Sequence, residues 1–307
     1  MKILLTGANG MVGKNILNHV EAEKYSFLTP SSQELNLLDK SLVNAFIIEH
    51  KPEFIIHAAG VVGGIQANIN NPVKFFVNNM LMGINLITTA SENNVKYLMN
   101  MGSSCMYPRN IHHALSEELI LKGELEPTNE GYALAKIAAA RLCEYLSREN
   151  ADLFYKTVIP CNLYGKYDKF DENNSHMIPA VIRKIDMAVR HNLDSVAIWG
   201  DGEARREFMY AEDLADFVFY AIKNFYKMPQ NLNVGIGHDY SINEYYKAIA
   251  TIVGFKGCFK HDLTKPVGMK RKVIDSRLLS EFGWKCNNDL YQGIAKTYQY
   301  FLDEIIK

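Results

Sequence analysis

The chain has 307 residues, 48% of them hydrophobic and 22% charged, a composition typical of a globular protein with a large core. A formal net charge of -1 gives no reason to expect a nucleic-acid partner, and no apolar run approaches the roughly 20 residues that a membrane-spanning helix needs. Because an apolar strand already begins at Lys2, we expect no signal peptide, no membrane association and a cytoplasmic protein.

The chain opens with a strand, a glycine-rich turn and a helix. Residues 2–6 are a short apolar strand, three glycines spaced three residues apart follow it, and an apolar-periodic helix then runs to about residue 20. In such a turn the first glycine allows the tight bend, the second lets a pyrophosphate approach the backbone, and the third lets helix and strand pack closely. The segment therefore predicts a dinucleotide-binding turn. Its predicted cofactor-binding residues are Gly7, Asn9, Gly10, Met11, Val12 and Gly13.

Strands and helices continue to alternate through the first half of the chain. Further strands are predicted at residues 26–29, 54–59, 97–101 and 154–160, and helices at residues 41–50, 72–93 and 132–150. This alternation predicts a parallel sheet with helices on both faces, which is a Rossmann-like, doubly wound α/β fold. Ligands then bind where the strands end.

The second half of the chain is less regular. Strands are expected at residues 196–199 and 231–235, and helices at residues 178–191, 211–225, 242–253 and 290–306. We therefore predict a dinucleotide-binding domain over residues 1–165. A smaller C-terminal α/β lobe, residues 166–307, would bind the substrate and be partly interleaved with the first domain.

Two short segments carry the candidate chemistry. Tyr132 and Lys136 are four residues apart and so share one face of a predicted helix, where the ammonium can hold the phenol near a substrate and lower its pKa from about 10. Ser103, just after a predicted strand, can hydrogen-bond the same substrate oxygen. These groups can protonate a carbonyl oxygen while a cofactor delivers a hydride. Ser104 leaves open which of the two hydroxyls points inward, because neighbours in a strand face opposite ways.

Six further segments carry a more specific pattern. They are Val62-Gly63-Gly64-Ile65, Gly102-Ser103-Ser104-Cys105-Met106-Tyr107-Pro108, Leu125-Glu126-Pro127-Thr128-Asn129-Glu130, Asn162-Leu163-Tyr164-Gly165, Asn174-Ser175-His176-Met177-Ile178-Pro179 and Arg206-Glu207-Phe208. On these motifs the sequence resembles the extended short-chain dehydrogenase/reductases, and within them the GDP-L-fucose synthase family of epimerase–reductases. The resemblance runs nearly from end to end.

The resemblance implies catalytic roles for five side chains. Tyr132 would be the general acid in the reduction of a 4-keto sugar, Lys136 would assist it and bind the nicotinamide ribose, and Ser103 would fix the carbonyl oxygen. Cys105 and His176 match the family's acid–base pair for epimerisation beside the keto group. In an extended chain Cys105 would share a face with Ser103. The alternatives are a buried structural cysteine and a histidine that only binds substrate; retention of both side chains does not establish that epimerisation occurs.

The resemblance also implies contacts to the nucleotide half of the substrate. The matching positions are Asn162, Lys184, Trp199, Arg206 and Arg271. Arg206 suits a diphosphate because guanidinium pairs bidentately with phosphate oxygens. Trp199 could face a base or ribose, and a core position is equally open. Lys184 stands where the family commonly has Arg, and guanine as the base follows from the resemblance alone.

The cofactor prediction is NADPH, with NADH as an alternative. No acidic residue ends the second predicted strand, which argues against strict NAD use. The basic residue that the family carries nearby is replaced by Ser31 and Ser32, so we expect weaker discrimination than usual. Asp39 matches a residue that contacts adenine, although it could equally be a helix cap, and Ala58 is a further predicted cofactor contact.

These observations predict NADPH-dependent reduction of the 4-keto group of a GDP-4-keto-6-deoxy sugar, with 3,5-epimerisation as in GDP-L-fucose synthesis. One alternative is a 4-reductase without epimerase activity on another GDP-4-keto sugar, such as a heptose, in surface-polysaccharide synthesis. Residues 109–114 differ from the usual family sequence and could reshape the pocket or form an ordinary surface loop. A distant alternative is a non-catalytic dinucleotide sensor, which retention of Ser103, Tyr132 and Lys136 disfavours.

Two further expectations concern assembly and the cysteines. The helices at 72–93 and 132–150 carry more apolar residues than one core face needs, including Met80, Met82 and Ile137, and in relatives these helices pair across a dimer. A homodimer is therefore expected, with ordinary core packing as the alternative. The five cysteines lack metal-ligand spacing, which suits a reducing compartment and predicts no metal site.

Overall fold

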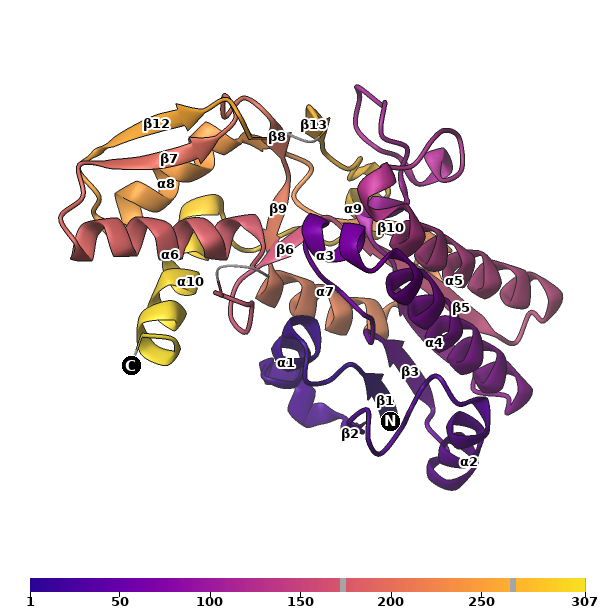
Figure 1. Ribbon diagram of the computed structural model, residues 1–307. Helices are drawn as coiled ribbons and strands as arrows, with labels where there is room; N and C mark the ends of the chain where they lie inside the picture. Colours follow the sequence, from indigo (N-terminus) through magenta and orange to yellow (C-terminus); the bar gives the residue numbers. More distant parts are fainter. Residues whose placement is uncertain (172–174, 266–268, 307) are drawn as a thin grey trace.

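The computed structural model describes residues 1–171, 175–265 and 269–306, and a parallel sheet lies at its centre (Figure 1). The sheet has six strands in the order β10-β5-β4-β3-β1-β2. They are β1 (Lys2–Thr6), β2 (Ser26–Leu28), β3 (Phe54–His57), β4 (Tyr97–Met101), β5 (Phe154–Pro160) and β10 (Asn231–Val234). The strand order reverses between β1 and β3, so a ligand-binding crevice is expected where these two strands end.

Helices cover both faces of this sheet. On one face α2 (Lys40–His50), α4 (Pro72–Glu92) and α5 (Glu130–Glu149) pack side by side, and on the other α1 (Met11–Leu17) packs against α7 (Ala211–Lys223). Consecutive side chains of β1 divide between the two layers: Ile3 and Leu5 join the cluster that includes α1 and α7, and Leu4 joins the cluster that includes α2 and α4. All three are fully buried, as expected for a strand covered on both sides. The predicted doubly wound fold is confirmed.

A smaller α/β lobe lies beside the sheet, at the upper left of Figure 1. Its helices are α6 (Met177–Arg190), α8 (Ile242–Val253) and α10 (Leu290–Glu304). Three small sheets accompany them: β7 (Ser195–Trp199) with β12 (Cys258–Asp262), β6 (Asn162–Tyr164) with β9 (Phe208–Tyr210), and β8 (Arg205–Arg206) between β11 (Tyr240–Ser241) and β13 (Arg271–Lys272). The three helices and the strands β6, β7, β9, β11 and β12 contribute residues to a separate hydrophobic cluster.

The two lobes are interleaved along the chain. Strand β10 and helix α7 come after residue 165, yet they belong to the first sheet and its covering layer. The boundary at residue 165 therefore remains a prediction. No helix in the described ranges is long and apolar enough to cross a membrane.

The element boundaries differ from the prediction in a few places. Helix α1 ends at Leu17, and a 3-10 helix over Val20–Lys24 replaces the expected last turn. The strand predicted over 54–59 ends at His57, which leaves Ala58 in the turn beside the glycine motif. The short helices α3 (Ile65–Asn70) and α9 (Arg277–Phe282) and the strands β6, β8, β9, β11 and β13, of two or three residues each, were missed because such segments show no periodicity.

Candidate active site

The glycine turn is packed too closely against its neighbours to carry side chains. Gly7 has a left-handed φ of +76°, and a Cβ on it would lie 2.6 Å from the backbone nitrogen of Ala59. A Cβ on Gly13 would lie 2.4 Å from the carbonyl oxygen of Gly7. Helix α1 begins after Gly10, whose lack of a side chain leaves the first N–H groups of the helix without a side-chain cap. The turn therefore fits a dinucleotide pyrophosphate.

The other predicted cofactor residues surround this turn or lie near it. Met11 and Val12 open α1, Asn9 is exposed in the turn, and Ala58 lies where β3 ends. Asp39 is the N-cap of α2: its carboxylate accepts hydrogen bonds from the Ser41 hydroxyl at 2.6 Å and from two backbone N–H groups, and these bonds lower its pKa. The helix-cap role of Asp39 is thus present, and its contact with adenine remains a prediction.

Tyr132 and Lys136 lie one turn apart near the start of α5. The Lys136 Nζ is 5.8 Å from the centroid of the Tyr132 ring and donates a hydrogen bond of 2.8 Å to the carbonyl of Met101, where β4 ends. The Ser103 hydroxyl hydrogen-bonds the Tyr132 hydroxyl, whereas Ser104 is buried in the 3-10 turn that follows. Ser103 is therefore the hydroxyl that shares the site with Tyr132.

Burial controls the charges in this cluster. It lowers the pKa of Lys136 to about 8, and together with the Lys136 charge it lowers the pKa of His57 to about 3. The Tyr132 side chain is only partly buried overall, but burial around its hydroxyl raises its pKa above the usual 10. Cys105 raises this pKa further, and only the Ser103 hydrogen bond lowers it. The expected lowering of the Tyr132 pKa is therefore not met, because desolvation of the phenolate raises it.

Cys105 lies next to the same cluster, in a different geometry from the one expected. The chain leaves β4 and forms a 3-10 turn over Ser104–Met106, in which the Cys105 N–H donates to the Ser103 Oγ at 3.2 Å. The expectation that both residues share a face of an extended chain is wrong, because this hydrogen bond closes a turn. The Sγ accepts from the Asn129 side chain at 3.2 Å and lies 3.8 Å from the Lys272 Nζ. Cys105 is only partly buried, which disfavours a purely structural role.

Sequence reasoning missed two of these partners. Asn129 lies within one of the motifs on which the family resemblance rests, so that motif could have identified it as a residue of the site. Lys272 adjoins the predicted substrate contact Arg271, but nothing in its spacing relates it to Cys105, which is 167 residues away.

His176 is the N-cap residue of α6 and is bonded to a carboxylate. Its Nδ1 lies 3.1 Å from the Asp168 Oδ1, and this hydrogen bond raises the pKa of His176. Within the described ranges no hydrogen bond or ion pair joins His176 to Cys105 or Tyr132. Asn174, part of the same motif, lies outside the described residues.

The predicted nucleotide contacts lie in the smaller lobe. Trp199 is 60% exposed at the end of β7, so the core position is wrong for this side chain. Arg206 is half-buried, and no carboxylate forms an ion pair with it among the residues that the structure describes. Burial lowers its pKa. Arg271 is instead ion-paired with the buried Asp239.

The two remaining contacts donate hydrogen bonds to the backbone. The Asn162 amide donates to the carbonyl of Glu207 at 2.9 Å, and Lys184 donates to the carbonyl of Ala197. Both side chains therefore help to fix the small sheets, and their contacts with a nucleotide remain predictions.

The unusual segment 109–114 belongs to a loop that is tied to the smaller lobe. The Leu115 N–H donates to the carbonyl of Val273 at 2.9 Å, and the Asp275 N–H donates back to Leu115 at 2.9 Å. This short parallel bridge holds the loop beside the segment that carries Lys272. The loop can therefore influence the position of the Lys272 ammonium beside Cys105.

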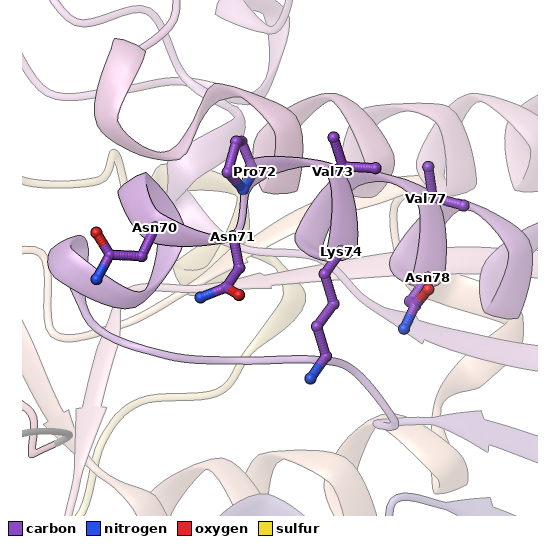
Figure 2. Close-up of a pocket in the computed structure, with 7 residues that line it drawn as sticks. All are labelled: Asn70, Asn71, Pro72, Val73, Lys74, Val77 and Asn78. Atoms are coloured by element: carbon purple, nitrogen blue, oxygen red, sulfur yellow. The ribbon is translucent and has the colours of Figure 1, made fainter.

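Two cavities lie away from these residues. One of about 440 Å³ is formed where α3 meets α4; Figure 2 shows Asn71, Lys74 and Asn78 extending to one side of the α4 start and Val73 and Val77 to the other. The second, of about 410 Å³, lies between β9 and the start of α10. Neither is lined by a residue of the predicted catalytic, cofactor-binding or substrate-binding set. In the described part of the chain no cluster of His, Cys, Asp or Glu could hold a metal ion.

Comparisons with known proteins place the chain in a family. Residues 3–237 match the model of the NAD dependent epimerase/dehydratase family. The chain is 67% identical to a GDP-L-colitose synthase from Yersinia pseudotuberculosis over 99% of both chains. It is 43% identical to a GDP-L-fucose synthase from Azorhizobium caulinodans, over 98% of this chain and 96% of the other. Its fold is similar to that of MlghC, a GDP-mannoheptose C4 reductase from Campylobacter jejuni solved with NADP bound, with a TM-score of 0.89 and 30% identity over 98% of each chain.

Proposed function

The chain belongs to the NAD dependent epimerase/dehydratase family, and we propose that it is an NADPH-dependent epimerase–reductase that acts on a GDP-4-keto-6-deoxy sugar. The names of its relatives, GDP-L-colitose synthase and GDP-L-fucose synthase, support this class of substrate. The observation that carries the proposal is the cluster in which the Ser103 hydroxyl bonds the Tyr132 hydroxyl and the Cys105 N–H donates to the Ser103 Oγ. It combines a proton donor for a carbonyl oxygen with a second proton-transfer group.

In the reduction, Tyr132 donates its proton to the 4-keto oxygen and Ser103 holds that oxygen by a hydrogen bond. NADPH, when bound, supplies the hydride for carbon 4. A raised pKa keeps the Tyr132 phenol protonated at neutral pH, so it is available as a proton donor, and the Lys136 Nζ lies 5.8 Å from the centroid of its ring. His57 stays neutral because burial lowers its pKa, so it adds no charge next to Lys136.

In the epimerisation, Cys105 and His176 exchange protons with carbons next to the keto group. The keto group makes these C–H bonds acidic, and inversion requires that a proton leaves one face and returns to the other. The Lys272 ammonium lies 3.8 Å from the Cys105 sulfur, so a cation stands beside this proposed proton-transfer group. Asp168 supports a protonated His176.

The nucleotide half of the substrate binds to the smaller lobe. Arg206 is suited to the diphosphate because no carboxylate among the described residues occupies its guanidinium. The exposed Trp199 offers an aromatic face for the base or ribose, and Asn162, Lys184 and Arg271 complete the proposed set. Trp199→Ala should raise KM for the GDP-sugar with little change in kcat; a loss of kcat alone would contradict a binding role.

NADPH is the proposed cofactor. The solved relative with NADP bound supports it, and the glycine turn fits a dinucleotide. Because Ser31 and Ser32 replace the basic residue expected near the 2′-phosphate, NADH should also be used, at a lower rate. Initial rates with the two cofactors at equal concentrations test this order.

The central experiment is a product analysis in deuterated water. The protein is incubated with NADPH and GDP-4-keto-6-deoxymannose, and in parallel with its 3-deoxy analogue, since colitose lacks the 3-hydroxyl that fucose carries. Deuterium next to carbon 4 and a product of the L-galacto configuration support the proposal. Reduction without deuterium incorporation would instead support the second candidate, a plain C4 reductase, which the likeness to a GDP-mannoheptose C4 reductase favours. Turnover of either sugar excludes the non-catalytic sensor.

A homodimer built on α4 and α5 completes the proposal. On α4 the apolar side chains of Val73, Val77, Leu81 and Ile84 are all more than one-third exposed and follow helical spacing. Ile137 is buried, so ordinary core packing explains that residue. Leu81→Lys should shift the mass measured by light scattering from dimer to monomer. We further propose that the enzyme is cytoplasmic and supplies a sugar donor for surface-polysaccharide synthesis.

A further inference from the structure

We propose that Asp168 is a positioning residue for His176, whose imidazole it holds with the Nδ1–H toward the carboxylate and Nε2 toward the substrate. The inference rests on the proposed function, because it assigns a task within the same site. The Asp168 Oδ1 lies 3.1 Å from His176 Nδ1. The Asp168 side chain is 3% exposed and the His176 side chain 38% exposed, so the carboxylate is beneath the ring and the ring faces outward.

The loop that carries Asp168 contains a residue with a left-handed backbone conformation. It follows β6, and Tyr167, the residue before Asp168, has a left-handed φ of 68°. For a bulky residue this conformation costs on the order of 1 kcal/mol or more, so surrounding contacts must hold it. One such contact comes from α1, where the Asn15 side chain donates to the carbonyl of Lys166 at 3.1 Å. The left-handed backbone at Tyr167 sets the direction of the next side chain, which is Asp168.

The carboxylate depends on His176 for its pairing. Its Oδ1 also accepts the backbone N–H of Lys169 at 2.8 Å, and its Oδ2 is buried without a hydrogen-bond partner among the described residues. Lys169 is the other charged group that acts on His176, and its charge opposes that of Asp168. A buried carboxylate is costly unless a donor compensates it. The burial of the Asp168 carboxylate is therefore explained by its hydrogen bond to His176.

The chemistry needs this arrangement. A neutral imidazole that donates Nδ1–H to a carboxylate has its lone pair on Nε2. When Nε2 removes the proton of a carbon next to the keto group, the C–H bond breaks, its electron pair forms the enolate, and the negative charge moves onto the keto oxygen. The imidazolium is then stabilised by Asp168. In the opposite direction the same Nε2–H returns a proton to that carbon.

The first test reads the histidine itself. In protein labelled with 15N at histidine, long-range 1H–15N spectra should show the His176 proton on Nδ1, with assignment from the His176→Gln variant. The imidazole should titrate above the ordinary pKa of 6.5, and in Asp168→Asn it should titrate at least one pH unit lower. A wild-type proton on Nε2, or an unchanged titration in Asp168→Asn, would overturn the proposal. The wild-type tautomer decides even where the variant does not fold.

The second test separates exchange from reduction. Asp168→Asn keeps an oxygen acceptor but loses the charge, so C–H exchange in deuterated water should fall about 100-fold. The reduction rate should change by less than about threefold, because Tyr132 performs that step. Asp186→Asn is the matched control: Asp186 is an equally buried aspartate that pairs with Arg190 in the same lobe, and its loss should leave the ratio of exchange to reduction unchanged. Equal losses of both rates in Asp168→Asn would show a merely structural role.

The two proposals fail in different ways. If the wild-type protein reduces its substrate without any C–H exchange, the proposed epimerisation is wrong, and the tautomer and titration of His176 still decide the role of Asp168. If the wild-type protein exchanges protons normally while Asp168→Asn does the same, only the role of Asp168 is wrong.

Discussion

The ammonium of Lys272 lies 3.8 Å from the sulfur of Cys105, although the two residues belong to different lobes. Lys272 is in β13, where it is the parallel partner of Arg206 in β8. This short strand pair thus places Arg206, which we propose binds the diphosphate, beside Lys272, the cation next to the candidate proton-transfer thiol of Cys105. Binding of the nucleotide at Arg206 and proton transfer at Cys105 should therefore be coupled through this pair.

Removing the Lys272 charge should slow chemistry at the Cys105 sulfur. Because the Lys272 ammonium lies 3.8 Å from the Cys105 sulfur, Lys272→Met should decrease the rate of Cys105 alkylation by iodoacetamide several-fold at pH 7, followed by peptide mass spectrometry. C–H exchange should fall with it. Lys270→Met is the control, because Lys270 is exposed on the same segment and, among the described residues, no hydrogen bond joins it to a sulfur. Equal alkylation rates in the two variants would exclude an electrostatic role for Lys272.

The glycine turn should tolerate no methyl group at Gly13. The added Cβ would meet the Gly7 carbonyl oxygen at 2.4 Å, and backbone cannot move aside without separating α1 from the turn. Gly13→Ala should lower the free energy of unfolding by about 1–3 kcal/mol and weaken NADPH binding, measured by urea unfolding and fluorescence titration. Gly64→Ala adds its Cβ to open space and should change neither value. Unchanged NADPH affinity in Gly13→Ala would place the dinucleotide elsewhere.

Loss of the Tyr132 hydroxyl should stop reduction and spare exchange. Tyr132→Phe removes the group that hydrogen-bonds Ser103 and should decrease NADPH oxidation by about 10² to 10⁴-fold. Deuterium incorporation next to carbon 4 should continue within a few-fold of the wild-type rate, because Cys105 and His176 remain. Tyr145→Phe, an exposed tyrosine on the same helix, is the control. A Tyr132→Phe enzyme that still oxidises NADPH at the wild-type rate would show that another group is the acid.

The sequence was sufficient for the parts of the molecule that local patterns determine. The buried runs of β1 and β3, the glycine turn and the long helix of Tyr132 each follow from composition and periodicity, and the parallel sheet follows from their alternation. The turn at Cys105 and the contact of Cys105 with Lys272 could not be predicted from the sequence. The turn at Cys105 is a 3-10 turn too short to show a periodicity, and the contact with Lys272 joins residues 167 apart through a strand of only two residues.

The pKa values illustrate the same limit. A Tyr–Lys pair at helical spacing suggested a lowered phenol pKa, but the sign is decided by how much water the fold removes from the hydroxyl. Burial depends on how the whole site is packed, so it cannot be predicted from the spacing of two residues.

Burial of Lys136 should make folding stability depend on pH. Its folded pKa of about 8 lies below the value of 10.5 for the exposed side chain, so the unfolded chain binds the extra proton between these limits. This contribution to stability is present above about pH 10.5 and is lost as the pH falls toward 8. Urea unfolding should therefore show the free energy of unfolding of wild type rising relative to Lys136→Met by about 1–3 kcal/mol between pH 8 and 10. Parallel pH curves for the two proteins would contradict a charged, buried Lys136.

Glu207 should be essential for the geometry of the substrate lobe. Its buried carboxylate accepts the N–H groups of Gly237 and Ile274, each at 2.8 Å, and so ties the loop after β10 to the segment after Lys272. In Glu207→Gln one oxygen becomes an NH₂ group that faces an N–H donor, which should lower the free energy of unfolding by about 1–3 kcal/mol and raise KM for the GDP-sugar.

The pH dependence provides an internal check on this residue. Burial raises the pKa of Glu207 to about 7, above the ordinary 4.5, so its contribution to stability is full below pH 4.5 and is lost as the pH rises through 7. The difference in unfolding free energy between wild type and Glu207→Gln should therefore shrink from pH 4.5 to 7. Glu203→Gln, which changes an exposed carboxylate two residues before β8, is the control for this comparison. A constant difference for Glu207→Gln would mean that this carboxylate stays ionised throughout the range.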